Sequence, residues 1–437
     1  MRQEKKISTD KRYSFPSEIE IVRYHQKYLI ISVNTACWIV AENEKQLYFF
    51  NLLRENTIGR SLELFNGESE DAIWIITQIE ARQFDSLDTV PVKEKTCMIY
   101  LTSACNLRCP HCYLSAGQAQ EGELSTSEIK QLLKSLSEEG IKELTFSGGE
   151  ICIRQDLIEI LSYAKGLSFE TKLLTNGTLW TQSMIDDVAK LVSSVQISID
   201  GFSEAENSKI RGIGNFAKAL TTLERFLSHN ISVQLAVTPF PEAGLANKIE
   251  EYAKFGIELN AKYEHKDFKI LFTTGIMDGR NLTLSNEERE QYKTIMQTVT
   301  AKYLGEEATD YPFILTHKSR KIMDNCSYGC LYIWSNGDVY MCSRSGLTPI
   351  ANIRTNSLES IMEFSRIANK SSNVNNLLSC KNCCLKYICG GGCRVVEFDA
   401  FKKGPALLSK EPIRDCSKEQ KEYFYDLMIR TNKSIFS

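Results

Sequence analysis

Hydrophobic and polar positions set the first 90 residues apart from the rest of the chain. Three short runs rich in β-branched and aromatic residues come first, and three stretches with apolar residues every three or four positions follow. The first kind of run predicts strands, and the second predicts amphipathic helices. The strands are predicted at Ile19–Tyr24, Tyr28–Val33 and Cys37–Ala41, and the helices at Glu44–Leu53, Ile58–Phe65 and Glu70–Phe84. This order predicts a winged-helix-like α+β module over residues 1–90, with a linker at 85–95.

From residue 96 the pattern changes to short apolar runs that alternate with amphipathic helices. Six strand–helix units of this kind predict a parallel sheet, because each helix carries the chain back to begin the next strand in the same direction. The strands are predicted at Cys97–Leu101, Glu143–Phe146, Thr171–Leu174, Val195–Ile199 and Ile231–Val237, with the last one within Ile257–Phe272. The fold class is therefore α/β, either an open sheet or a partial barrel. Both bind ligands at the C-terminal ends of their strands.

After about residue 320 the alternation stops, and a loop-rich, cysteine-rich region follows an amphipathic helix at 285–304. Three domains are thus predicted, at 1–90, 96–310 and 320–437. The 437 residues are 43% hydrophobic and 24% charged, which is sufficient apolar material for sizeable cores.

Charge and hydropathy disfavour several classes of partner. The formal net charge is −3 with both signs interspersed, so the chain offers no basic field to a phosphate backbone, and nucleic acid is not expected to bind. No apolar run approaches about 18 residues, and none follows the polar N-terminus, which argues against a membrane span and an export signal. The expected location is the cytoplasm.

Fifteen cysteines in such a chain favour metal binding or catalysis over disulfides, because cytosolic thiols are kept reduced. Cys105, Cys109 and Cys112 lie in the run Cys-Asn-Leu-Arg-Cys-Pro-His-Cys, on the loop after the first parallel strand. Three thiolates can ligate three corners of a cubane iron–sulfur cluster and leave the fourth iron open to a substrate or cofactor. Zinc is the alternative for three thiolates.

Glycine and polar residues follow the next three predicted strands. The segments are Ser147-Gly148-Gly149-Glu150, Thr175-Asn176-Gly177 and Ser198-Ile199-Asp200-Gly201. Glycines at a strand end let backbone groups approach a ligand closely, and Glu150 can accept a hydrogen bond from an ammonium group. For the Gly-Gly-Glu segment alone, an ordinary strand-end turn is the alternative.

The loop from Cys105 to Cys112 resembles the signature loop of the radical S-adenosylmethionine (SAM) enzymes. The resemblance implies a partial (β/α)6 barrel and a catalytic 4Fe–4S cluster on Cys105, Cys109 and Cys112, whose open iron is chelated by the amino and carboxylate groups of SAM. It also implies reductive cleavage of the sulfonium to methionine and a 5′-deoxyadenosyl radical, which abstracts hydrogen from an unactivated C–H bond.

The strand-end motifs match positions at which that family binds SAM, including its Gly-Gly-Glu motif and its ribose and methionyl carboxylate sites. The residues so implied are His111, Gly148, Gly149, Glu150, Asn176, Ser198, Asp200 and Arg211. Arg211 resembles the arginine that clamps the carboxylate, with a solvated surface arginine as the alternative. His111 stands where the family has an aromatic residue beside the adenine, with a packed loop residue as the alternative.

Eight further cysteines near the C-terminus resemble the SPASM extension of this family, which carries two auxiliary 4Fe–4S clusters. The resemblance implies one cluster on Cys326, Cys330, Cys342 and Cys393 and another on Cys380, Cys383, Cys389 and Cys416. Closed clusters suit electron transfer or the folding of a loop-rich region. Zinc knuckles are the alternative. The spacings favour Cys383 over its neighbour Cys384 as a ligand.

The N-terminal module resembles the recognition elements, similar to the small chaperone of quinone-cofactor biosynthesis, that bind leader peptides by strand addition. An unrelated packing domain is the alternative, and a DNA-reading winged helix is disfavoured because Glu70–Phe84 has only Arg82 as a base. Together the resemblances imply a radical SAM maturase of a ribosomally made precursor peptide. Its electron donor would be a protein such as flavodoxin or ferredoxin.

The bond that such a maturase forms is predicted from three runs that resemble thioether-forming enzymes. These are Cys109-Pro-His-Cys-Tyr-Leu, Ser147-Gly-Gly-Glu-Ile and Leu174-Thr-Asn-Gly-Thr-Leu. They imply a Cys sulfur-to-carbon crosslink. Because these runs flank cofactor motifs, carbon–carbon crosslinking and epimerisation remain alternatives. So do a formylglycine-forming maturase of sulfatases and a non-catalytic iron–sulfur or zinc protein that binds a peptide.

Overall fold

The computed structural model describes residues 7–86, 96–305, 323, 325–326, 328–344, 347–398 and 416–436. Most of the predicted linker at 85–95 lies outside these residues. The N-terminal part forms a three-stranded antiparallel sheet and three helices, in the predicted order. These elements are β1 (Ile19–Tyr24), β2 (Lys27–Ser32), β3 (Cys37–Ala41), α1 (Glu44–Glu55), α2 (Ile58–Leu64) and α3 (Ser69–Arg82).

Both faces of this small sheet are buried. Ile30 and Ile39 pack with the apolar face of α1 and α3, whereas Ile31 and Trp38 point to the opposite side. Successive side chains of a strand alternate between faces, so an unbroken apolar run such as that of β2 requires cover on both sides. A second group of elements must therefore pack against the face that carries Trp38.

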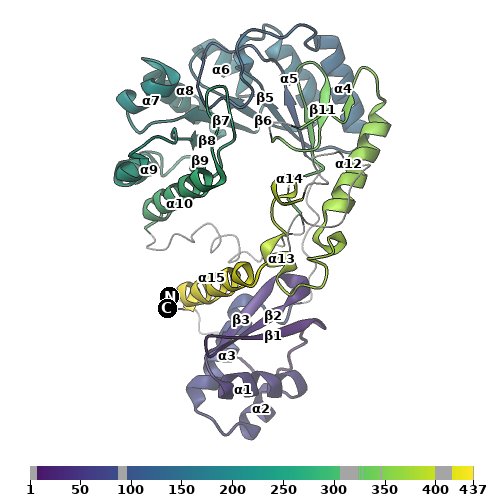
Figure 1. Ribbon diagram of the computed structural model, residues 1–437, viewed down its shortest axis with the longest axis vertical. Helices are drawn as coiled ribbons and strands as arrows, with labels where there is room; N and C mark the ends of the chain where they lie inside the picture. The colour runs from purple at the N-terminus through teal and green to yellow at the C-terminus, as the bar shows by residue number, and fades with distance from the viewer. Residues whose placement is uncertain are drawn as a thin grey trace.

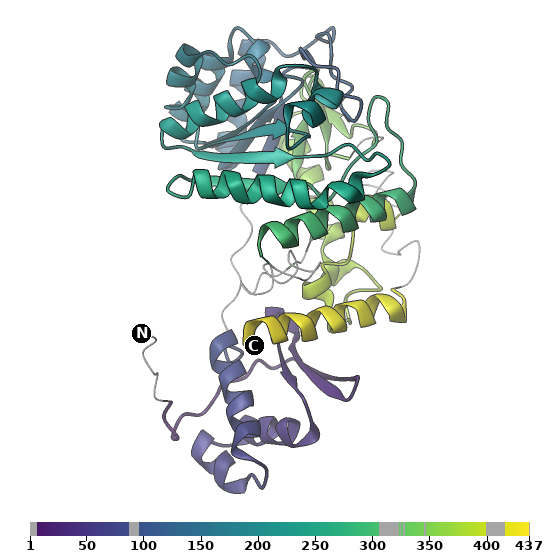
Figure 2. The same ribbon diagram turned by 90° about the vertical axis from the view of Figure 1, so that its left-hand side faces the viewer.

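The C-terminal end of the chain supplies that cover. Leu385, next to α13 (Lys386–Cys389), and Met428 of α15 (Lys418–Phe436) belong to the apolar cluster around Trp38. The Trp38 indole N–H donates to Met428 O at 3.1 Å. Figures 1 and 2 both show α15 lying across the three-stranded sheet. The N-terminal module therefore shares apolar packing with the cysteine-rich region.

The second sheet contains nine strands in the order β12-β11-β10-β4-β5-β6-β7-β8-β9. Neighbours from β10 through β4 to β9 are parallel, whereas β11 and β12 run antiparallel to theirs. The strands are β4 (Thr96–Tyr100), β5 (Glu143–Ser147), β6 (Glu170–Thr175), β7 (Ser194–Ile199), β8 (Ser232–Val237), β9 (Phe268–Phe272), β10 (Leu331–Ile333), β11 (Asp338–Tyr340) and β12 (Ala351–Asn352). The predicted α/β fold with a barrel-like parallel sheet is confirmed.

Helices connect the parallel strands and form an arc outside them in Figure 1. They are α4 (Thr126–Glu138), α5 (Leu157–Gly166), α6 (Gln182–Val188), α7 (Glu204–Arg211), α8 (Asn215–Ser228), α9 (Ile249–Lys262) and α10 (Asn286–Tyr303), with α12 (Leu358–Ser372) and α14 (Arg394–Glu397) further along the chain. The α4 helix shows why the sequence folds this way. Ser125 and Glu128 form a capping box at its start, and Leu133 and Leu136 are buried on its inner face.

The last parallel strand, predicted within 257–272, is found at Phe268–Phe272, after α9, which continues to Lys262. Two further elements have no counterpart in the sequence prediction. The α7 helix is polar, and Asn207 is its one buried residue, which leaves no apolar periodicity to predict it. The β10 strand arises in the cysteine-rich region and extends the barrel sheet beside β4. Across the described ranges, no helix is both long and apolar enough to cross a bilayer.

Candidate active site

The loop that carries Cys105, Cys109 and Cys112 leaves the C-terminal end of β4. Its two ends are joined because the Cys105 N–H donates to Gly117 O at 2.9 Å. Within the loop, the Cys112 N–H donates to Cys109 O at 3.2 Å, and the Leu107 N–H lies 3.4 Å from Cys105 Sγ. One short, internally bonded segment therefore presents all three thiols.

Arg280, in the loop after β9, holds the cysteine loop from outside. Its backbone N–H donates to Cys112 O at 3.1 Å, and its guanidinium donates to Cys109 O at 3.3 Å and to Ala116 O. Arg280 was not predicted from the sequence, because no motif marks its loop and the two segments meet only in the folded sheet.

Gly148 and Gly149, after β5, lie directly against the start of the cysteine loop. The Gly149 N–H donates to Thr102 O at 2.8 Å, and the Glu150 N–H donates to Ala104 O at 2.7 Å. A Cβ on Gly148 would meet Thr102 O at 2.4 Å, and a Cβ on Gly149 would meet Ala104 O at 2.2 Å. Only glycine allows this approach between two backbones.

The Glu150 carboxylate joins the ends of β5 and β6 and is 1% exposed. Its Oε1 accepts from the Thr175 hydroxyl at 2.6 Å, and its Oε2 accepts from the Asn176 N–H at 2.7 Å. Burial raises the pKa of Glu150, although these hydrogen bonds oppose the shift. Both oxygens accept from protein groups, so the carboxylate positions the end of β6. A carboxylate oxygen can accept more than one hydrogen bond, and acceptance from a ligand ammonium stays a prediction.

Asn176 connects the end of β6 to the cysteine loop. Its Nδ2 donates to Asn106 Oδ1 at 3.0 Å and lies 3.9 Å from Cys105 Sγ. Its Oδ1 accepts from the Thr178 N–H at 2.9 Å, which fixes the orientation of the amide. A side-chain N–H directed at a sulfur atom stabilises negative charge on that sulfur.

Asp200, after β7, and Arg211, at the end of α7, form a buried ion pair. Nε and Nη2 of Arg211 donate to the two Asp200 oxygens at 2.7 and 3.1 Å. The Asp200 N–H donates to Asn207 Oδ1 at 2.9 Å, and the Tyr252 hydroxyl donates to Asp200 O at 2.9 Å. Burial by itself lowers the pKa of Arg211, but Asp200 and the nearby Cys109 thiol outweigh burial, so the net pKa is raised. Arg211 is therefore a buried partner of Asp200, close to the cysteine loop, and not a solvated surface arginine.

His111, within the cysteine loop, lies next to this ion pair. Its Nε2 is 3.6 Å from Asp200 Oδ2, and its ring meets that of Phe240 edge-on with the centroids 6.4 Å apart. Burial lowers the pKa of His111, while Asp200 opposes the shift and Arg211 adds to it. Nδ1 is buried and has no hydrogen-bond partner among the described residues. A polar ligand atom at this position would relieve the cost of that burial.

Ser198 is the predicted SAM-binding residue with the weakest link to this site. It lies on β7, on the opposite face from Ile197 and Ile199, and is partly buried. The described part of the structure shows no hydrogen bond between its side chain and the cysteine loop.

Two of the three thiols in the loop have raised pKa values, which a bound metal cofactor would lower. Burial raises the pKa of Cys105, and it raises the pKa of Cys109 to about 11. The Cys112 thiol adds to both shifts, so the three side chains lie within electrostatic reach of one another. Bound iron would supply the positive charge that turns such thiols into thiolates. Over the described ranges, no three Cys, His, Asp or Glu side chains lie close enough together to hold one metal ion.

Residues 99–244 match the radical SAM superfamily. The matched segment runs from β4 to beyond β8 and contains the cysteine loop, the two glycines after β5 and the Asp200–Arg211 pair. The barrel of this chain is a radical SAM domain.

Curated relatives align with parts of this chain. Fe-coproporphyrin III synthase of Methanosarcina barkeri is 39% identical over 32% of this chain and 35% of its own length. The sporulation killing factor maturation protein SkfB of Bacillus subtilis is 31% identical over 33% of this chain and 35% of its own length. PqqA peptide cyclase of Bradyrhizobium diazoefficiens is 23% identical over 75% of this chain and 92% of its own length. This chain thus spans about a third of the first two relatives.

A solved structure shares the fold over most of the chain. The structure of anSMEcpe with bound AdoMet, another name for SAM, has a TM-score of 0.54 and 18% sequence identity, covering 77% of this chain and 99% of that chain. At this identity the similarity shows the fold alone.

Beyond the radical SAM domain, three of the four cysteines predicted for one auxiliary cluster affect the pKa of the fourth. Burial raises the pKa of Cys389 to about 11, and Cys380, Cys416 and Cys383 add to the shift, so all three lie within its electrostatic reach. The Cys383 N–H donates to Cys380 O at 2.9 Å, and the Cys389 N–H donates to Leu385 O at 2.8 Å. Short helical turns therefore set the spacing of these thiols.

Cys384 is a partner of Cys383. Its thiol forms a hydrogen bond with Cys383, which lowers the pKa of Cys383 although burial opposes the shift. This contact favours Cys383 as the thiolate of the pair.

In the set predicted for the other auxiliary cluster, two cysteines affect the pKa of a third. Burial raises the pKa of Cys342, and Cys326 and Cys393 add to the shift. Cys330 lies where β10 meets β4, and the Thr96 hydroxyl is 3.9 Å from its Sγ. Cys326 and Cys393 thus lie within electrostatic reach of Cys342, and Cys330 lies directly before β10, beside β4.

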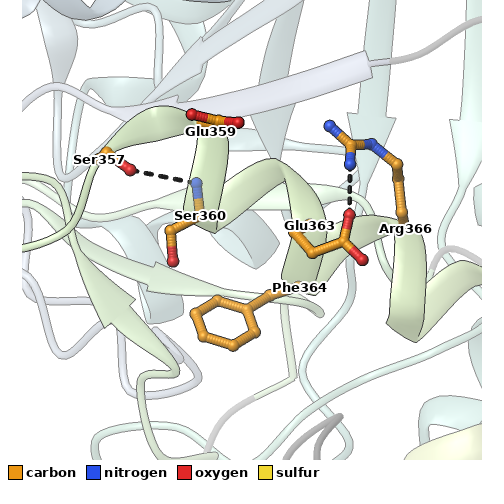
Figure 3. Close-up of a pocket in the computed structure, with 6 residues that line it drawn as sticks. All are labelled: Ser357, Glu359, Ser360, Glu363, Phe364 and Arg366. Carbon is orange, nitrogen blue, oxygen red and sulfur yellow. Dashed lines mark hydrogen bonds and ion pairs between the residues drawn. The ribbon is translucent and has the colours of Figure 1, made fainter.

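A hollow on α12 is unrelated to these cysteine groups (Figure 3). Its lining residues are Ser357, Glu359, Ser360, Glu363, Phe364 and Arg366. The Ser360 N–H donates to Ser357 Oγ at 3.2 Å, and Arg366 donates to Glu363. Because these polar groups pair within one helix, the hollow presents no set of groups directed at a ligand.

Proposed function

We propose that this protein is a radical SAM maturase that modifies a ribosomally made precursor peptide. The observation that carries the proposal is the cysteine loop, which Gly149 and Arg280 hold and which His111 and Asp200 border. The names of two relatives, PqqA peptide cyclase and the killing factor maturation protein, support a peptide or protein product. Fe-coproporphyrin III synthase is named for a different product, so the radical SAM domain alone does not determine the substrate.

At this site a 4Fe–4S cluster and SAM would supply a 5′-deoxyadenosyl radical that removes hydrogen from the peptide. The three thiols of the loop would hold the cluster, and Asn176 would donate toward Cys105 Sγ. The buried His111 Nδ1, which has no partner among the described residues, would face SAM. Asp200, which Arg211 holds, would keep the His111 ring in place.

The C-terminal cysteines would hold two auxiliary 4Fe–4S clusters, in the two groups described above. Cys330 is proposed as the fourth ligand beside Cys326, Cys342 and Cys393. These clusters would accept the electron that is released when a crosslink closes, and a protein such as flavodoxin or ferredoxin would reduce the catalytic cluster. The proposed crosslink is a thioether between a cysteine sulfur and a carbon atom of the peptide.

The proposed function is tested with anaerobically reconstituted protein and the peptide encoded by a small reading frame beside its gene. Reduction should release methionine and 5′-deoxyadenosine, and the peptide should lose two hydrogen atoms and one alkylatable thiol per crosslink. The same mass loss with every thiol retained would indicate a carbon–carbon bond. An unmodified peptide despite SAM cleavage would contradict peptide maturation.

The edges of the N-terminal sheet differ, and this bears on where a peptide strand would bind. On β3, the Val40 N–H donates to Gln78 Oε1 at 2.8 Å, and Val40 O accepts from Gln78 Nε2 at 2.8 Å. The Trp74 indole N–H also donates to Val40 O, at 3.1 Å. A side-chain amide therefore already occupies the place of a fourth strand on this edge.

The other edge is β1, and no strand of the described part pairs with its outer side. Val40 directs its N–H and C=O away from β2. Along an antiparallel strand, successive residues direct these backbone groups to alternate sides. The register of the three strands therefore directs the N–H and C=O of Ile21 and Arg23 away from β2 as well. We therefore propose that the precursor peptide adds to β1 as an extended strand.

An Ile21→Pro substitution should weaken binding of the precursor peptide by about tenfold, because proline removes one outward N–H donor while the pairing with β2 is retained. Fluorescence anisotropy with a labelled peptide and the full chain measures this. Gln78→Ala at the β3 edge is the matched control and should leave the affinity unchanged. The opposite pattern would place the peptide on β3. Deleting residues 1–90 is a poorer test, because it uncovers the apolar surface around Met428.

A further inference from the structure

Arg394 is a buried arginine that belongs to neither predicted set of cluster ligands. It follows Cys393 directly and is 0% exposed. An arginine keeps its positive charge in proteins, and a charge taken out of water is costly unless an opposite charge lies near. Arg394 therefore requires a negative charge close to its guanidinium.

The guanidinium lies inside the turn that joins Cys389 to Cys393. Its Nη1 donates to Gly390 O at 3.0 Å and to Gly392 O at 2.6 Å, and its Nε donates to Ser372 O at 2.7 Å. All three acceptors are neutral carbonyls. These hydrogen bonds orient the side chain but do not neutralise its charge.

The turn is built tightly around this side chain. The intervening residue Gly391 has a φ of +74°, and a Cβ there would lie 3.2 Å from Arg394 Nη1. Since Cys389 belongs to one predicted set and Cys393 to the other, the turn connects the two auxiliary sites. Arg394 therefore lies at their junction.

No carboxylate neutralises Arg394 in the part of the chain that the structure describes. Its Nη2 is buried and has no hydrogen-bond partner among the same residues. Four thiols from both sets, Cys326, Cys380, Cys389 and Cys393, lie within electrostatic reach of the guanidinium. The Phe398 ring centroid also lies 5.8 Å from its Cζ, and this contact brings no negative charge. Thiols become thiolates when they ligate iron, so the opposite charge would arrive with the clusters.

We propose that Arg394 is a positioning residue that supplies one positive charge shared by the two auxiliary clusters, with Nη2 as a donor to cluster sulfur. Positive charge and N–H donors near an iron–sulfur cluster favour its reduced form, because reduction adds negative charge. Arg394 therefore raises the reduction potentials of these clusters and makes them better electron acceptors. The inference rests on the auxiliary clusters of the proposed function.

The test uses full-length protein in which Cys105, Cys109 and Cys112 are alanine, so that only the auxiliary clusters remain. An iron content of about eight per chain confirms these clusters independently of Arg394. Redox titration followed by electron paramagnetic resonance (EPR) then gives their potentials. Arg394→Met should shift both potentials to more negative values, whereas Arg394→Lys should shift them less.

The matched control is Arg366→Met, which removes an exposed arginine paired with Glu363 and should leave the potentials unchanged. Unchanged potentials in Arg394→Met at full iron content would overturn the inference. If Arg394→Met loses iron while Arg394→Lys retains it, the requirement for charge is supported. Loss of iron from both variants would show that the guanidinium only holds the turn, and this too would overturn the inference.

Discussion

A Gly149→Ala substitution should reduce SAM-dependent turnover by about 10²-fold or more. The added Cβ would lie 2.2 Å from Ala104 O and 2.6 Å from the carbonyl carbon of Ala104, and neither backbone atom can rotate away. The start of the cysteine loop must then move, and the hydrogen bond from the Glu150 N–H to Ala104 O would be lost with it. Displacements of this size at a reacting centre remove the alignment on which radical transfer depends.

The matched control is Gly166→Ala at the end of α5, where an added Cβ meets nothing within 4 Å. It should retain full turnover and equal or greater stability, because alanine favours the helix. Release of 5′-deoxyadenosine by the reconstituted variants measures the effect. Full activity in Gly149→Ala would show that the contact between the two backbones is not needed for catalysis.

An Arg211→Met substitution should destabilise the barrel by about 3–5 kcal/mol, because it leaves a charged carboxylate buried without its partner. Asp200 is fully buried, and both of its side-chain oxygens accept from Arg211. The loss should appear as a lower Tm of the anaerobic, reconstituted protein, measured by circular dichroism.

A double variant identifies the cause of that loss. Asp200→Asn combined with Arg211→Met removes both charges and should recover much of the Tm, since the unpaired charge is the main cost. Equal Tm values for the single variant and the native protein would contradict a structural ion pair. An Arg366→Met control, which breaks an exposed pair, should change the Tm little.

The strands and helices were predictable where the apolar residues recur with one clear spacing. The bounds of β1 and β3 agree with the prediction, because β-branched and aromatic runs are bounded there by turn residues. The α7 helix was missed because it buries only Asn207, and β10 to β12 were missed because runs of two or three residues carry no period. Their positions are fixed by pairing with β4 and with one another.

Site residues that lie close to one another in the sequence were predictable, whereas those that meet only in the fold were not. The cysteine loop and the glycines after β5 are contiguous motifs, so the residue types alone indicate their chemistry. Arg280 reaches the loop from more than a hundred residues away, and only the folded sheet reveals it. The pairing of Arg211 with Asp200, and the engagement of Glu150 by Thr175, likewise depend on packing that no spacing rule describes.

The division into three domains stays a prediction, and the structure shows contacts between these parts that the sequence did not indicate. Trp38 of the N-terminal module packs with Met428 near the opposite end of the chain, and β10 joins the cysteine-rich region to the barrel sheet. Local periodicity cannot report such contacts, because they join positions hundreds of residues apart. The close association of these parts suits an enzyme that would hold a peptide between a binding module and a radical centre.

The EPR spectrum of the anaerobically reduced protein, recorded with and without SAM, tests most directly whether the iron left open by Cys105, Cys109 and Cys112 binds SAM. SAM should change the cluster signal of the native protein and should have no effect when the three cysteines are replaced by alanine. A native spectrum that SAM leaves unchanged, or a change that persists in the triple variant, would contradict SAM binding at this iron.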